Sequence, residues 1–174
     1  MVVEDRLCCS EPSKRPDVVG LAALAPRLPE RGSWEALMTH HPVIAIDIEP
    51  LLVEALAIRT GVAGLHHVQV RLQDVTRLGL GITSGSADVI LLFNLLHCEE
   101  PVALLRAAHE ALRPAGRVGI IHWRSDVPTP RGPALSIRPG PQNCVDWLVQ
   151  AGLSIDRPPV ALPPYHFGLV GIKS

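Results

Sequence analysis

The strongest constraint on the fold lies in residues 86–123, where two hydrophobic runs flank a helical pattern. The first run has the aliphatic character of a strand that is buried on both faces. It reads Ser86-Ala-Asp-Val-Ile-Leu-Leu-Phe-Asn-Leu-Leu-His97. Apolar residues then recur at helical spacing after Pro101, and a second hydrophobic run ends in His122 and Trp123. The segment therefore predicts two buried strands joined by an amphipathic helix.

A second unit of the same kind precedes this one. Two further strands are predicted at 43–47 and 68–72, with a helix between them that begins near Pro50. A helix over 142–151 and two short strands, 155–162 and 167–172, follow at the other end, and a weak strand at 17–24 and a helix at 34–40 lie upstream. This alternation predicts an α/β fold, with a doubly wound, Rossmann-like, mostly parallel sheet and an antiparallel last strand. We expect the segments 43–47, 68–72, 88–93 and 117–122 to share that sheet.

Length and composition favour one domain and exclude several classes of protein. Residues 1–16 are polar and read as a loose tail, so the domain is expected to span 17–174. The formal charge is −1 and the basic residues are scattered, so nucleic acid is not an expected partner. No run approaches the roughly 20 apolar residues of a membrane span. Adjacent Cys8 and Cys9 suit neither a disulfide framework nor a metal site, which favours a cytoplasmic location.

Polar side chains stand where the predicted strands end. Asn94, His97 and His122 follow the two central strands, and Asp47 and Asp74 follow the upstream pair. Ligands of open parallel sheets bind at the carboxyl ends of the strands, so this pattern favours a nucleotide-like cofactor. Each histidine taken alone is more often structural than catalytic. Their wide separation also argues against a metal site, and we predict none.

At this point the sequence resembles the class I S-adenosylmethionine-dependent methyltransferases, near the small-molecule group that includes the ubiquinone and menaquinone methylases. The resemblance is strongest over residues 43–123. The matching segments, in order, are Val-Ile-Ala-Ile-Asp47-Ile-Glu-Pro, Gln-Asp74-Val, Ala-Asp88-Val-Ile-Leu-Leu-Phe-Asn94-Leu-Leu-His97, and Glu99-Glu-Pro-Val-Ala-Leu-Leu-Arg-Ala-Ala-His-Glu-Ala-Leu-Arg-Pro-Ala-Gly-Arg-Val118.

The resemblance implies a role for each matched position toward S-adenosylmethionine. Asp47 would accept hydrogen bonds from the ribose hydroxyls, and a carboxylate suits that task because it accepts two at once. Ile48 would pack on the adenine, Asp74 would meet its amino group, and Val75 would offer a backbone N–H to the ring. Asn94 and Leu95, together with His97, would lie beneath the methionine part and the transferable methyl.

The chain departs from the family before the strand at 43–47. The family carries a glycine-rich loop there, whereas this sequence reads Leu-Ala-Ala-Leu-Ala-Pro-Arg-Leu-Pro-Glu-Arg-Gly32, in which two prolines remove N–H donors. Two interpretations stay open. Either cofactor binding is impaired, or the upstream segment is a truncated or frame-shifted version of the family's start.

The function expected from this is methyl transfer to a small-molecule acceptor. His97 or His122 would serve as a general base where the acceptor requires one, and His166 would lie at the rim of the site. The alternative is a catalytically impaired domain that acts as a binding or dimerisation scaffold, and the sequence is compatible with a homodimer. A nicotinamide-dependent reductase is disfavoured, since no G-x-G-x-x-G motif follows the first strand.

Overall fold

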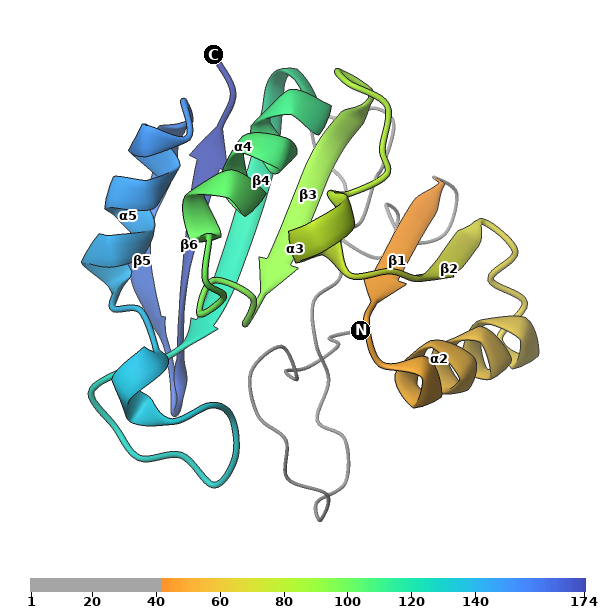
Figure 1. Ribbon diagram of the computed structural model, residues 1–174, viewed down its shortest axis with the longest axis horizontal. Coiled ribbons are helices and arrows are strands. Elements are labelled where there is room, and N and C mark those ends of the chain that lie inside the picture. Colours follow the sequence, from red (N-terminus) through yellow and green to blue (C-terminus); the bar gives the residue numbers. More distant parts are fainter. Residues whose placement is uncertain (1–41) are drawn as a thin grey trace.

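The computed structural model describes residues 42–174; the tail at 1–16, the strand at 17–24 and the helix at 34–40 that the sequence predicts lie outside them. Strands and helices alternate, as expected (Figure 1). The elements are β1 (Val43–Asp47), α2 (Pro50–Val62), β2 (Val68–Leu72), α3 (Val75–Leu78), β3 (Ala87–Phe93), α4 (Pro101–Ala111), β4 (Leu112–Trp123), the 3-10 helix η1 (Leu135–Ile137), α5 (Pro141–Gln150), β5 (Ser154–Leu162) and β6 (His166–Ile172). None of the described helices is both long and apolar enough to cross a membrane.

The strands form two groups. β1 pairs with β2 in parallel, and the other four strands form a sheet in the order β3-β4-β6-β5. β3 and β4 are parallel, whereas β6 is antiparallel to both β4 and β5. The α/β class and the antiparallel last strand are thus confirmed. The expectation of one sheet is wrong for the described residues, because no hydrogen-bonded ladder within 42–174 joins β1 to β3. A hydrophobic run identifies a buried strand, but it does not identify the strand's neighbours.

Both sheets contribute to one hydrophobic core. Apolar residues of β1 belong to the same buried cluster as the inward-facing residues of β3 and β4. α4 and α5 cover one face of the four-stranded sheet in Figure 1. α4 contributes Leu104, Leu105 and Ala108 to the cluster, and α5 contributes Cys144 and Leu148. Pro101 and Pro141 each begin a helix at the first helical position, where the absent N–H would have had no partner inside the helix.

β4 begins earlier than the sequence predicts. The pattern Arg113-Pro-Ala-Gly116 is typical of a helix end and places the start of the strand at residue 117. Instead Leu112 is already extended, at φ −68° and ψ 138°, and it lies opposite Ala87 of β3. Arg113 forms an ion pair with the buried carboxylate of Asp88 at this edge. This pair holds the start of β4 against β3 and gives Asp88 a structural role.

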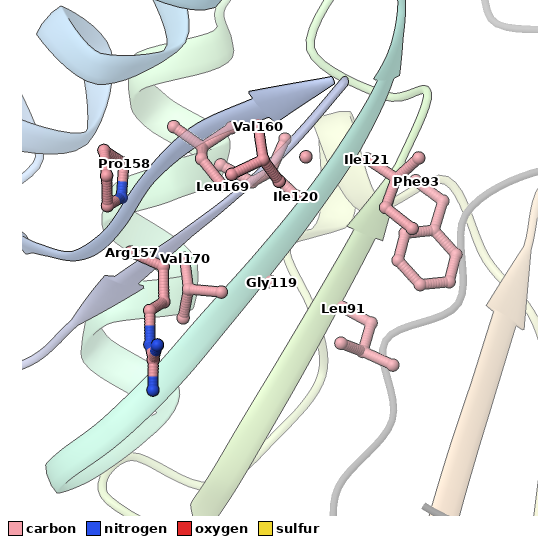
Figure 2. A pocket seen from close by; sticks show the side chains of 11 residues that line it. Leu91, Phe93, Gly119, Ile120, Ile121, Arg157, Pro158, Val160, Leu169 and Val170 are labelled. Atoms are coloured by element: carbon pink, nitrogen blue, oxygen red, sulfur yellow. The ribbon is translucent and has the colours of Figure 1, made fainter. Parts of the chain in front are cut away.

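An apolar pocket of about 650 Å³ lies along the sheet face that carries the alternate side chains of β3 and β4 (Figure 2). Leu91 and Phe93 of β3 line it, together with Gly119 and Ile121 of β4. None of the candidate site residues named from the sequence is among its lining residues. The pocket therefore marks an apolar face of the sheet.

Gly171 of β6 lies where a methyl group would collide with the core. A Cβ at this position would stand 2.9 Å from Leu148 Cδ2 and 3.0 Å from Val118 Cγ1, and both side chains are fully buried. We expect Gly171→Ala to lower the free energy of unfolding by about 1–2 kcal/mol, measured by urea denaturation. Gly61 is the matched control, since a Cβ added there would meet nothing within 4 Å, and Gly61→Ala in α2 should be neutral or stabilising. Equal losses from both substitutions would contradict the packing described here.

Candidate functional site

Asp47 ends β1 with a buried carboxylate that is only half satisfied. The parallel register places it opposite Leu72, and its backbone oxygen accepts a hydrogen bond from Gln73 N at 2.8 Å. Its Oδ1 accepts from the backbone N–H of Glu49 at 2.8 Å, whereas Oδ2 is buried and has no hydrogen-bond partner among the described residues. Burial raises the pKa of Asp47 to about 6, although the backbone N–H donors oppose the shift. A buried acceptor of this kind is suited to a ligand that brings a donor.

Asp74 follows β2 and caps α3. Its Oδ1 accepts from the backbone N–H groups of Thr76 at 3.0 Å and Arg77 at 3.3 Å, and also from the Thr76 hydroxyl at 2.6 Å. Val75 is the first residue of α3, a position whose backbone N–H finds no partner inside a helix. Aspartate is frequent in turns and caps, and Asp74 has such a structural role here. Because Asp47 and Asp74 follow two paired parallel strands, both lie at the same edge of that sheet.

Asn94 follows β3 in a conformation that few residues adopt. Its φ is +56°, in the left-handed region that asparagine tolerates better than most side chains. Its backbone N–H donates to Ile121 O at 2.8 Å, which ties it to β4, and the residue is 1% exposed. Its Oδ1 is buried without a hydrogen-bond partner in the described part of the chain. Leu95 follows it and belongs to the hydrophobic core.

The structure brings His97 and His122 together at the ends of β3 and β4. Their ring centroids lie 5.7 Å apart with the planes at 72°, an edge-to-face contact. His122 is fully buried, and its Nδ1 lies 3.2 Å from the backbone oxygen of Trp123. Burial lowers the pKa of His122 to about 3, and nearby His97 adds to the shift. His122 is therefore neutral at physiological pH, with its Nε2 buried and lacking a partner among residues 42–174.

His166 contacts Trp123, the residue that follows His122 in the chain. Trp123 and His166 are opposite each other in the β4–β6 ladder, and their ring centroids lie 4.0 Å apart with the planes tilted by 34°. Burial lowers the pKa of His166, and the positive charges of Arg131 and Arg138 lower it further. The three histidines predicted from the sequence thus come from neighbouring strands at one end of the sheet.

Two residues of this region were not predicted. Trp123 is 2% exposed and its Nε1 has no hydrogen-bond partner within the described residues. Arg138 is 8% exposed, and its Cζ lies 5.6 Å from the Trp123 ring centroid. Its guanidinium also donates to the backbone oxygens of Pro133 at 2.8 Å and Arg124 at 3.1 Å. Trp123 could have been noticed from its place directly after His122, whereas nothing in the sequence distinguishes Arg138 from the surface arginines.

The donor set suits an adenosyl ligand better than a metal ion. No group of three potential metal-ligating side chains occurs in the part of the chain that is described. Asp47 and Asn94 each offer a buried oxygen that lacks a donor there. Ile48, half-buried beside Asp47, offers an apolar contact. β1, β3 and β4 all end on the lower side of the molecule in Figure 1, but the convergence of the Asp47 and Asn94 groups on one ligand remains a prediction.

Solved structures of methyltransferases share the α/β fold of this chain. A SAM-dependent methyltransferase from Aquifex aeolicus matches with a TM-score of 0.67 at 22% identity, over 76% of this chain and 69% of that one. A type 11 methyltransferase from Sulfolobus solfataricus matches with a TM-score of 0.60 at 27% identity, over 76% and 72% of the two chains. The [4+2]-cyclase SpnF matches with a TM-score of 0.67 at 15% identity, over 80% and 69%.

The sequence itself identifies the family. A search of curated protein sequences gave no significant match. The methyltransferase domain family, in contrast, matches residues 29–120, which is more than half of the chain. This match includes β1 to β3, α4 and most of β4, and so all of the predicted cofactor-binding residues. The chain belongs to the methyltransferase domain family, of class I, and its cofactor is S-adenosylmethionine.

Proposed function

We propose that this protein transfers the methyl group of S-adenosylmethionine to a small-molecule acceptor. The observation that carries the proposal is the buried Asp47 Oδ2, which has no donor within residues 42–174. A pair of ribose hydroxyls would supply that donor, and it would offset the cost of keeping this carboxylate charged in a buried position. The likeness to the cyclase SpnF means that the fold alone does not fix the reaction.

The remaining cofactor contacts are assigned by position. Ile48 packs against the adenine, and the N-terminal end of α3 presents Asp74 and the Val75 N–H to the ring edge. Asn94 and Leu95 form the floor under the methionine part, where the left-handed turn fixes the amide. The cofactor supplies a methyl group already activated by its positive sulfur. The chain's task is therefore to align the acceptor and to exclude water.

The three histidines have different roles toward the acceptor. A group whose pKa is about 3 is a poor base near neutral pH, so His122 orients the acceptor through Nε2 rather than removing its proton. His97 or His166 takes the proton where the acceptor is a hydroxyl or an acidic carbon.

The small-molecule class of acceptor and the cytoplasmic location both belong to this proposal. The location is supported by the Cys8-Cys9 pair, whose spacing suits no disulfide framework.

The first experiment separates methyl transfer from the scaffold alternative. S-adenosylhomocysteine should raise the thermal unfolding midpoint of the full chain in a concentration-dependent way, as any ligand specific to the folded state does. A panel of hydroxyl, amine and acidic-carbon compounds is then tested for release of S-adenosylhomocysteine from S-adenosylmethionine. An unchanged unfolding midpoint at saturating S-adenosylhomocysteine would favour the scaffold alternative. A raised midpoint with no product from any acceptor would mean that the chain binds the cofactor without catalysing methyl transfer.

The histidine roles make a separate prediction. With an acceptor found in that panel, replacing His97 or His166 with Gln should lower kcat by about 100-fold if that residue is the base. His122→Gln should mainly raise KM for the acceptor, since it removes an orienting contact. S-adenosylhomocysteine affinity, measured by calorimetry, should stay within about twofold of wild type in the His122 and His166 variants, and His97→Gln should still bind the ligand. Unchanged turnover in all three would reduce these histidines to structural residues.

A further inference from the structure

One face of α2 carries an apolar stripe that is exposed in the described part of the chain. Its inward side contributes Leu56 to the core. On its outer side Leu51, Ile58 and Val62 are 67%, 60% and 86% exposed, and the small Ala55 is exposed between them. α2 lies at the periphery of the described elements in Figure 1, beside β1 and β2. A surface helix normally has one polar face, so apolar residues on both sides indicate a second packing partner.

The spacing of the stripe is that of a helix–helix seam. Leu51, Ala55, Ile58 and Val62 follow one another at intervals of four, three and four positions. This is the alternation of the d and a positions in a heptad, which places all four side chains along one line of the helix. Ala55 in the middle of the line allows two helix backbones to approach closely.

The charges beside the stripe indicate which kind of helix would fit. Glu54 and Arg59 flank it on opposite sides, at the g position of one heptad and the e position of the next. Among residues 42–174 neither side chain takes part in an ion pair. In a parallel, in-register pair of α2 helices, Glu54 of each copy would face Arg59 of the other, twice by symmetry. An antiparallel pair would bring like charges together on each flank.

We infer that α2 is the interface of a parallel two-fold dimer of this chain. The self-complementary charges select a second copy over an unrelated partner, because each α2 carries both halves of the required pair. The seam is short, so the dimer is expected to be reversible and concentration-dependent. This inference does not rest on the proposed function, since α2 need not contact the acceptor for the pairing to form.

The test measures the self-association of the full chain by sedimentation velocity, at concentrations up to about 100 µM. Ile58→Glu should raise the dimer dissociation constant by about tenfold or more, because it places two like charges opposite each other in the seam. Val149→Glu on α5 is the matched control, because Val149 is equally exposed at 60% and lies on a different helix. It should leave the dimer unchanged.

Charge exchange tests the orientation of the helices. Glu54→Arg and Arg59→Glu should each weaken the dimer by about threefold or more, whereas the double variant should return close to wild type. These positions are exposed, so the series stays decisive even if Ile58→Glu misfolds. A wild-type monomer at every concentration, equal weakening by Val149→Glu, or no recovery in the double variant would each overturn the inference.

Discussion

Asp47→Asn is expected to weaken the binding of S-adenosylhomocysteine by about 100-fold, because the two ribose hydroxyls lose a charged acceptor. The substitution keeps the shape of the side chain, and an amide oxygen can still accept the 2.8 Å hydrogen bond from Glu49 N. What changes is the buried Oδ2, the atom that has no partner among the described residues. Isothermal titration calorimetry on the full chain measures the change directly.

Asp88→Asn is the control for this experiment. Asp88 is buried to a similar degree, at 4% exposed against 5% for Asp47, but it lies at the start of β3 and pairs with Arg113. Its substitution should cost stability and leave the affinity for S-adenosylhomocysteine within about twofold of wild type. Equal losses of affinity in the two variants, with both proteins folded, would refute the assignment of Asp47 to the ribose.

The second large effect concerns stability in acid, where two buried groups act in opposite directions. The pKa of Asp47 is about 6 in the folded chain against 3.8 ordinarily, so the folded state takes up this proton first and gains stability as the pH falls from 6 to 4. The pKa of His122 is about 3 against 6.5 ordinarily, so the unfolded state takes up that proton first. The folded state therefore loses stability as the pH falls from 6.5 toward 3.

Single variants should separate these two contributions. Between about pH 7 and pH 4.5, Asp47→Asn should lose roughly 2 kcal/mol more stability than wild type, because it lacks the compensating proton uptake. Over the same interval His122→Gln should lose roughly 2–3 kcal/mol less than wild type. Urea denaturation at the two pH values gives both differences. If both variants lost more stability than wild type over this interval, or both lost less, one of these side chains would not be buried as described.

Much of this architecture could be predicted from local sequence patterns. The aliphatic run before Asn94 predicted β3, and the apolar spacing after Pro101 predicted α4. The contact between His97 and His122 follows from the same reasoning, since the carboxyl ends of parallel neighbours meet at one edge. Such features depend on residues close together in sequence, or on a rule that every parallel sheet obeys.

The features that the sequence did not predict depend on distant partners. Leu112 extends β4 because Ala87 lies opposite it, and no local pattern shows that pairing. The short α3 forms where Asp74 caps it, and four residues are too few for a periodic signal. Arg138 is buried because carbonyl groups of the loop before α5 converge on its guanidinium. Strand neighbours are equally non-local, which is why the separation of β1 from β3 could not be predicted.

The strand order β3-β4-β6-β5 has a consequence for synthesis on the ribosome. β6 comes after both of its neighbours in sequence, yet it lies between them and contributes Phe167 and Leu169 to the core. Until β6 has emerged from the ribosome exit tunnel, β4 has one open edge and β5 has no strand to pair with. Both present unsatisfied backbone groups at that stage. The sheet therefore closes only after translation has passed Ile172, and the nascent chain keeps these open edges until then.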